Sequence, residues 1–133
     1  MKRFEEIDHT ADWAFRAYGR DLKELFENAA AALFALEGVG EQPTAVTREV
    51  QVEGIDYESL LVNWLGELLY LQETRHETYH RFSVDRLSST LLSARVEGAG
   101  SGTLNKFVKA ITYHDLRIEQ TPEGWAATVV VDV

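Results

Sequence analysis

The sequence contains no cysteine, few basic residues and no long apolar run. Without cysteine, disulfide bonds and thiolate metal sites are excluded. No segment approaches the ~20 consecutive apolar residues of a membrane span. The first six residues lack the apolar centre of a signal peptide, so we expect a cytoplasmic protein. Since 45% of the 133 residues are hydrophobic, we expect a single domain with a real core, residues 1–133.

The shortage of basic residues restricts the kind of partner. Lysine and arginine number 13 against 22 acidic residues, which gives a net charge of −9. Nucleic-acid affinity comes largely from neutralised phosphates, so direct RNA or DNA binding is not expected. Cations and basic protein surfaces are the favoured partners. A negative surface that only keeps the protein soluble is the open alternative.

The hydrophobic pattern predicts two helices and about seven or eight strands. Asp21 and Asp56 are N-cap residues that open helices to about Leu36 and Glu73, each with an apolar stripe at helical spacing. Alternation of apolar and polar residues predicts strands at 4–7, 13–18, 47–54, 82–85, 92–96, 107–114, 116–120 and 125–131. The expected fold is α+β, a two-layer sandwich in which two helices pack on a mixed or antiparallel sheet.

Two acidic residues stand at the ends of predicted strands. Asp12 precedes the strand that begins at Trp13, and Asp132 closes the apolar run from Trp125 to Val131. If the two ends meet, their carboxylates and the terminal carboxylate of Val133 offer oxygen ligands to a divalent cation. The alternative is that Asp12 is a turn residue and Asp132 a solvated end.

A second candidate is the segment Lys109 to His114. On a strand, Lys109, Ile111 and Tyr113 share one face. An inward-facing lysine beside carboxylates would stay charged and could hold a phosphate or an acidic group of a partner. An ordinary edge strand with a surface lysine is the competing interpretation.

Other patterns carry less chemistry. The histidines match no zinc spacing, so His9 is expected to order its turn rather than to bind a metal directly. The glycine-rich stretch 97–102 lies between two predicted strands, not before a helix, and is expected to be a flexible hairpin connection. No Gly-x-Ser-x-Gly elbow is present, so the motifs do not support intrinsic catalysis.

Taken together, five motifs resemble the archease family along the whole chain and in the family's order. They are His9-Thr10-Ala11-Asp12, Asp21-Leu22-Lys23-Glu24-Leu25-Phe26, Leu60-Leu61-Val62-Asn63-Trp64-Leu65, Lys109-Ala110-Ile111-Thr112-Tyr113-His114 and Asp132-Val133. The resemblance implies the archease fold. It also implies an accessory protein, not an enzyme, that promotes guanylylation and multiple turnover of a GTP-dependent RNA ligase in tRNA splicing or RNA repair.

The resemblance also implies roles for single residues. Asp12, Asp132 and Val133 would bind a divalent metal ion, calcium first, with magnesium or manganese as alternatives. Lys109 would serve activation or partner contact. His9 and His114 are possible members of the shell around the metal ligands.

Two other functions stay open at this point. A general protein chaperone would act without the metal. A metal-dependent phosphoester hydrolase would use the same acidic pair, but the sequence shows no evident general base for it. The sequence leaves the oligomeric state open.

Overall fold

The structure is a computed structural model that describes residues 1–9, 12–101, 104 and 107–133, with His9 and Asp12 described by their backbone alone. Thr10 and Ala11 of the motif His9-Thr10-Ala11-Asp12, and Gly102 of the glycine-rich stretch, lie outside the described residues. The elements in chain order are β1 Phe4–His9, β2 Asp12–Gly19, α1 Leu22–Leu36, β3 Val46–Glu53, α2 Tyr57–Arg75, β4 Glu77–Leu87, β5 Leu91–Gly100, β6 Ala110–Ile111, β7 Arg117–Thr121 and β8 Gly124–Asp132. Across the described ranges, no helix is long and apolar enough to cross a membrane.

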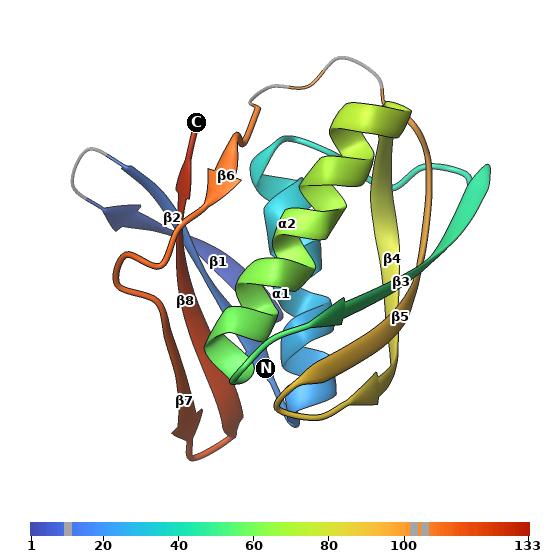
Figure 1. Cartoon of the computed structure of the whole chain (residues 1–133). Helices are drawn as coiled ribbons and strands as arrows, with labels where there is room; N and C mark the ends of the chain where they lie inside the picture. Colours follow the sequence, from blue (N-terminus) through green and yellow to red (C-terminus); the bar gives the residue numbers. More distant parts are fainter. Residues whose placement is uncertain (10–11, 102–103, 105–106) are drawn as a thin grey trace.

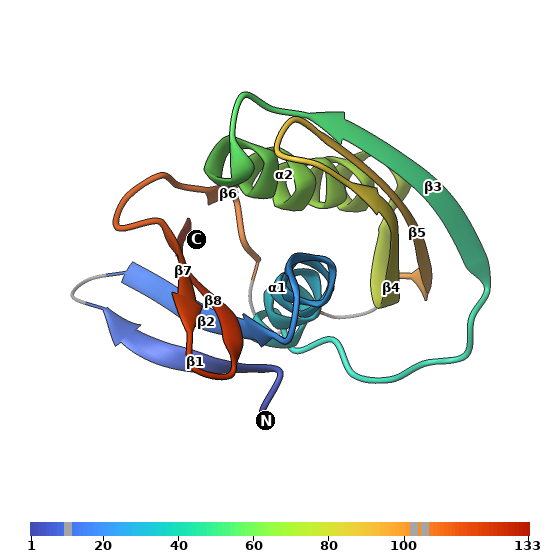
Figure 2. The same cartoon turned by 90° about the horizontal axis from the view of Figure 1, so that it is seen from below.

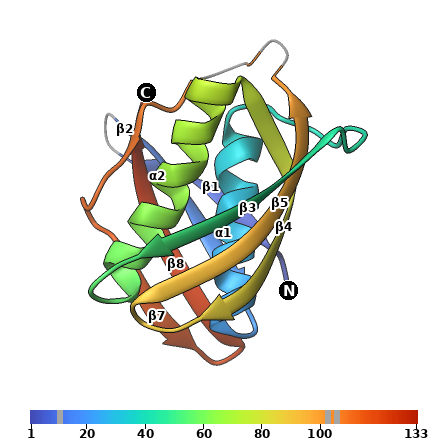
Figure 3. The same ribbon diagram turned by 45° about the vertical axis from the view of Figure 1, so that its right-hand side comes forward.

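The strands form two antiparallel sheets with both helices between them (Figures 1 and 2). One sheet has the order β1-β2-β8-β6, with β7 also paired to β8, and the other has the order β3-β5-β4. Figure 3 shows the three-stranded sheet lying across the helices. The expected α+β class, with two helices and about eight strands, is confirmed. The strands are divided between two sheets, which differs from the single sheet expected.

A single core joins the two sheets through the helices. Phe15 of β2 and Val129 of β8 face it from one side, and Val50 of β3 and Leu92 of β5 face it from the other. Burial alternates along β3 and β5, as the apolar residues do in their sequences, whereas β8 buries six successive residues from Ala126 to Val131. The pattern therefore predicts strands without showing to which sheet they belong.

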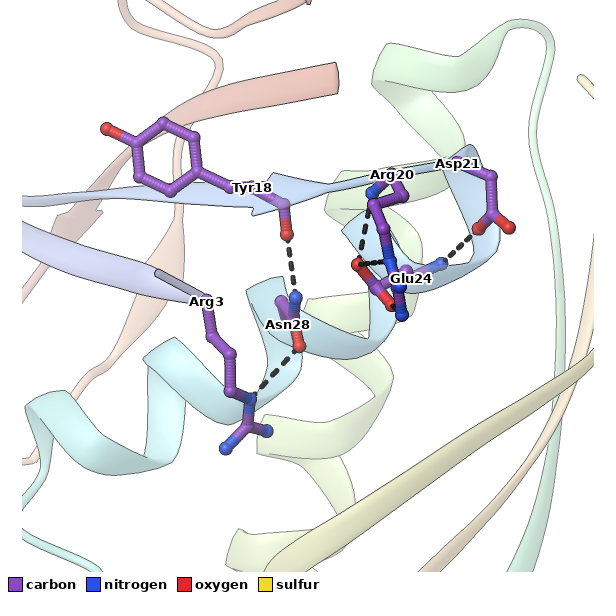
Figure 4. Close-up of polar contacts among 6 residues, drawn as sticks. All are labelled: Arg3, Tyr18, Arg20, Asp21, Glu24 and Asn28. Atoms are coloured by element: carbon purple, nitrogen blue, oxygen red, sulfur yellow. Dashed lines mark hydrogen bonds and ion pairs between the residues drawn. The ribbon is translucent and has the colours of Figure 1, made fainter. Parts of the chain in front are cut away.

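Polar contacts fix helix α1 to the sheet that carries β1 and β2 (Figure 4). The Asp21 side chain accepts a hydrogen bond from the Glu24 amide at 2.8 Å and caps the helix. The Asn28 side chain donates to the Tyr18 carbonyl at 2.7 Å and accepts from Arg3 Nε at 3.2 Å. The two bonds of Asn28 tie the N-terminal half of α1 to β2 and to Arg3, the residue before β1.

Helix α2 begins with a capping box, in which Asp56 and Ser59 bond each other's backbone amides. Trp64 of α2 is fully buried, and its indole N–H donates a hydrogen bond to the Phe26 carbonyl of α1 at 3.0 Å. The two helices are therefore joined by a hydrogen bond inside the apolar core.

The glycine-rich stretch is part of a strand. Strand β5 runs to Gly100, and Gly98 pairs with Tyr79 of β4. The expected flexible hairpin connection is therefore wrong for residues 97–100. A Cβ on Gly98 would overlap the carbonyl oxygen of Thr78. Glycine is needed here because the two backbones approach closely, next to a bulge between Tyr79 and Arg81.

Gly98→Ala is expected to lower the free energy of unfolding by about 1–3 kcal/mol, because the added methyl group forces the strands apart. Gly40→Ala is the matched control, since a Cβ there meets nothing within 4 Å. Urea denaturation of both variants measures the difference. Equal midpoints for the two variants would contradict the close approach at Gly98.

A partly buried ionic network joins β3 to the start of β4. The Arg48 guanidinium donates to both carboxylate oxygens of Glu77, at 3.0 Å and 2.7 Å, and the Tyr79 hydroxyl donates to one of them at 2.8 Å. The hydrogen bond from Arg48 is the main reason that the pKa of Glu77 lies below its ordinary value. Burial is the main reason that the pKa of Tyr79 is raised.

This network predicts a pH-dependent cost of Glu77→Gln. A glutamate whose pKa is lowered by folding stabilises the fold above about pH 4.3 and loses that contribution as the pH falls through its folded pKa. We expect the variant to be about 1–2 kcal/mol less stable than the parent at pH 7. The difference should shrink toward pH 3. Urea denaturation at both pH values tests this, with the exposed Glu49→Gln of β3 as the control.

Candidate functional site

The backbone register brings Asp12 and Asp132 to the same edge of the five-stranded sheet. Trp13 of β2 pairs with Val131 of β8 in antiparallel register. Asp12 and Asp132 each lie one residue beyond this last pair, on the two neighbouring strands. On the other side of β2, His9 of β1 pairs with Asp12. The residues that the sequence singled out at the two ends of the chain are thus neighbours across strands.

Strand β6 adds Lys109 to this edge. Ala110 pairs with Asp132, and the Lys109 amide donates to the Asp132 carbonyl oxygen at 2.8 Å. Figure 1 shows the C-terminus beside β6, at the end of β8. The ends of β1, β2, β8 and the start of β6 therefore meet in one place. We call this place, defined by His9, Asp12, Lys109, Asp132 and Val133, the acidic edge.

The acidic edge is open to solvent where its side chains are described. Asp132 and Lys109 are exposed, and Val133 is 48% exposed. The carbonyl oxygen of Asp132 is already engaged by Lys109. The Asp132 carboxylate and the main-chain oxygens of Val133 are thus described oxygen donors at this end of β8, and a second aspartate, Asp12, begins the neighbouring strand β2.

The oxygen atoms that these residues offer are of the type that a hard divalent cation binds. Carboxylate and main-chain oxygens are the ligands that calcium and magnesium prefer. Among the described side chains, no group of three or more His, Asp or Glu residues could hold a metal ion. The Asp12 side chain lies outside that description, so the acidic edge rests on its backbone register.

Lys109 differs from its predicted setting. The expected strand from Phe107 to His114 shrinks to Ala110–Ile111, and Lys109 is exposed rather than directed inward. The Thr112 hydroxyl donates to the Val130 carbonyl at 2.9 Å and accepts from the His114 amide at 3.3 Å. The Thr112 amide also donates to the Val130 carbonyl, whereas the His114 amide bonds the Thr112 hydroxyl, a local side-chain contact that favours a turn.

The two histidines fall at different places. His9 lies on the acidic edge by its backbone pairing with Asp12. His114 lies in the turn after β6, where its Nε2 is 3.5 Å from a carboxylate oxygen of Asp115. Asp115 has a left-handed backbone, with φ of 52°, within the turn that follows the end of β6 at Ile111. His114 therefore belongs to the turn that follows the acidic edge.

The sequence interpretation missed Glu37, which bonds the backbone of Val108, the residue before Lys109. Glu37 is fully buried, and one of its carboxylate oxygens accepts a hydrogen bond from the Val108 amide at 3.0 Å. A signal for it exists in the sequence. Glu37 follows Leu33 by four residues, so it continues the apolar stripe of α1, where a charged residue is unexpected.

Comparison with known proteins gives a consistent result. Residues 4–133 match the Archease protein family (MTH1598/TM1083). The chain is 40% identical to protein archease of Methanosarcina acetivorans, covering 99% of this chain and 97% of that protein, and 39% identical to protein archease of Pyrococcus abyssi, covering all of both.

Solved structures agree with the sequence relatives. The solution structure of Methanobacterium thermoautotrophicum protein 1598 superposes with a TM-score of 0.71 at 34% identity and covers the whole of both chains. The crystal structure of an archease, a possible chaperone, from Thermotoga maritima shares the fold, with a TM-score of 0.68 at 21% identity over 97% of this chain and 96% of that one. The resemblance seen in the five motifs is confirmed: this chain belongs to the archease family.

Proposed function

We propose that this protein binds a divalent cation at the acidic edge and activates a GTP-dependent RNA ligase, promoting guanylylation of the ligase and its multiple turnover. Membership of the archease family supports this function. The observation that carries it is the register of β2 and β8, in which Asp12 and Asp132 lie one residue beyond the last pair, Trp13 and Val131. The protein would act as an accessory factor in the cytoplasm, in tRNA splicing or RNA repair, without catalysis of its own.

The charge of the protein fits this role. With a net charge of −9, the molecule as a whole repels RNA and attracts basic protein surfaces. We therefore place the contact with the ligase protein, not with its RNA. The acidic edge is a suitable point of contact because Lys109, Asp132 and Val133 are open to solvent.

Each residue of the acidic edge has a defined task in this proposal. Asp12, Asp132 and the main-chain oxygens of Val133 would hold the cation, calcium in the first place and magnesium or manganese otherwise. When bound, the cation would offset negative charge on the nucleotide phosphates in the ligase. Lys109 would contact the ligase or a phosphate, while its backbone holds Asp132. His9, whose backbone pairs with Asp12, would order the turn between them.

Asp132→Asn is expected to weaken calcium binding by about tenfold or more, since it removes a formal charge from the ligand set. Titration calorimetry with calcium, and then magnesium and manganese, measures the affinity. Asp85→Asn is the matched control, because Asp85 is an exposed aspartate on β4 of the other sheet. Unchanged affinity in the Asp132 variant, or equal losses in both variants, would contradict the assignment.

Lys109→Ala is expected to separate ion binding from activation. The exposed ammonium group is lost while the backbone bond to Asp132 remains, so calcium affinity should stay within about twofold. The stimulated rate of ligase guanylylation should fall by about tenfold or more. The control is Lys23→Ala, an exposed lysine on α1. Full stimulation by the Lys109 variant would remove Lys109 from the proposal.

The same assays separate the two competing functions. A general chaperone would suppress aggregation of an unrelated protein equally well with a chelator and with Asp132→Asn. A metal-dependent hydrolase would turn over a generic phosphoester without any ligase. Either result, together with an unstimulated ligase, would replace the proposed function.

A further inference from the structure

Glu37 is a buried carboxylate at the junction of three elements. It is the C-cap residue of α1 and is 0% exposed. One carboxylate oxygen accepts from Gln72 Nε2 of α2 at 2.8 Å, and the other accepts from the Val108 amide at 3.0 Å. Both donors are neutral amides. The carboxylate thus joins both helices to the segment that enters β6.

A charged carboxylate at this buried position lowers the stability of the fold. Burial raises the pKa of Glu37 above its ordinary value, and the two hydrogen bonds only partly oppose that effect. The C-terminal end of a helix carries partial negative charge, which further disfavours an acidic residue there. Residues that cost stability in this way concentrate at sites where they serve a function.

The bond to Val108 acts one residue away from the acidic edge. The Val108 side chain is buried in the core, and its amide is held by Glu37. The next residue, Lys109, donates its amide to Asp132, and Ala110 pairs with Asp132. Two successive amides, those of Val108 and Lys109, are therefore bonded in opposite directions, one to the helix pair and the other to the end of β8.

Strand β6 needs such support because it is only two residues long. A strand of this length adds few ladder bonds, so its position depends on what holds its flanks. On the far flank, Thr112 bonds Val130 through its amide and its hydroxyl. On the near flank, Glu37 supplies the corresponding bond.

We propose that Glu37 is a positioning residue for the acidic edge: its carboxylate clamps the Val108 amide and so fixes the backbone of Lys109 against Asp132. The consequence for activation rests on the proposed function, whereas the clamp itself does not. Glu37 touches neither the cation nor the ligase in this account. It acts only by holding Lys109 in place.

Two variants separate the hydrogen bond from simple packing. Glu37→Met keeps a side chain of similar length and removes both acceptors. Glu37→Gln keeps an oxygen for the Val108 amide. Within the described part of the chain, Gln72 Oε1 is buried without a hydrogen-bond partner. The Gln72 amide can therefore turn over and accept from the introduced NH₂ group, so this variant restores the clamp.

The direct test is amide hydrogen exchange at Lys109, followed by NMR. Loss of one hydrogen bond to a charged group corresponds to a change on the order of 10- to 100-fold. We expect exchange at Lys109 to accelerate by that factor in Glu37→Met and to stay within about threefold of the parent in Glu37→Gln. Val50→Ala, a core truncation in β3, is the control for general destabilisation.

The result that would overturn the clamp is equal exchange at Lys109 in Glu37→Met and in Val50→Ala, or equal acceleration in both Glu37 variants. The guanylylation assay then tests the consequence. Stimulation should fall about tenfold in Glu37→Met and be retained in Glu37→Gln. If the parent protein itself fails to stimulate the ligase, the proposed function fails, while the exchange data still decide the clamp.

Discussion

The arrangement of this molecule depends on the antiparallel register between β2 and β8. Phe15 and Ala17 of β2 lie in the core together with Val129 and Val131 of β8, and a shift by one residue would move these side chains out of the core to the other face of the sheet. The free energy of apolar burial therefore fixes the register. Asp12 and Asp132 follow the last pair of this register, Trp13 and Val131, on neighbouring strands. Two like charges close together on neighbouring strands destabilise a sheet, and a bound cation would relieve such a repulsion.

The second half of the acidic edge is held by polar contacts instead. Strand β6 is short, and its neighbours are secured by Glu37 on one flank and by Thr112 on the other. The apolar core thus places the aspartates, while hydrogen bonds place Lys109. Asp132 and Lys109 of the acidic edge are thus positioned through their backbones, although both are exposed. This division also gives a buried glutamate in the helix pair a task at a site that it does not touch.

Much of the fold follows from local signals in the sequence. Asp21 and Asp56 were predicted to open the helices, and they are the N-caps of α1 and α2. Both aspartates of the acidic edge were found because each stands where a strand pattern begins or stops. Such signals are readable because caps and strand ends depend on neighbouring residues alone.

What the sequence did not reveal depends on contacts between distant segments. The division of the strands into two sheets, the shortening of β6 and the close approach at Gly98 are set by packing partners far along the chain. Glu37 was overlooked for the same reason, since the partners Gln72 and Val108 lie 35 and 71 residues away. The one local signal for Glu37 is that it is a charged residue within the apolar stripe of α1.

The most direct test of the account is paramagnetic broadening of backbone amide signals by manganese. With stoichiometric manganese, signals of Asp12, Asp132 and Val133 should broaden first, followed by those of His9 and Lys109, and calcium should reverse the effect by competition. Residues of the three-stranded sheet, such as Asp85, should keep sharp signals. Broadening centred elsewhere, or none at the acidic edge, would contradict the claim that these opposed strand ends bind a divalent cation.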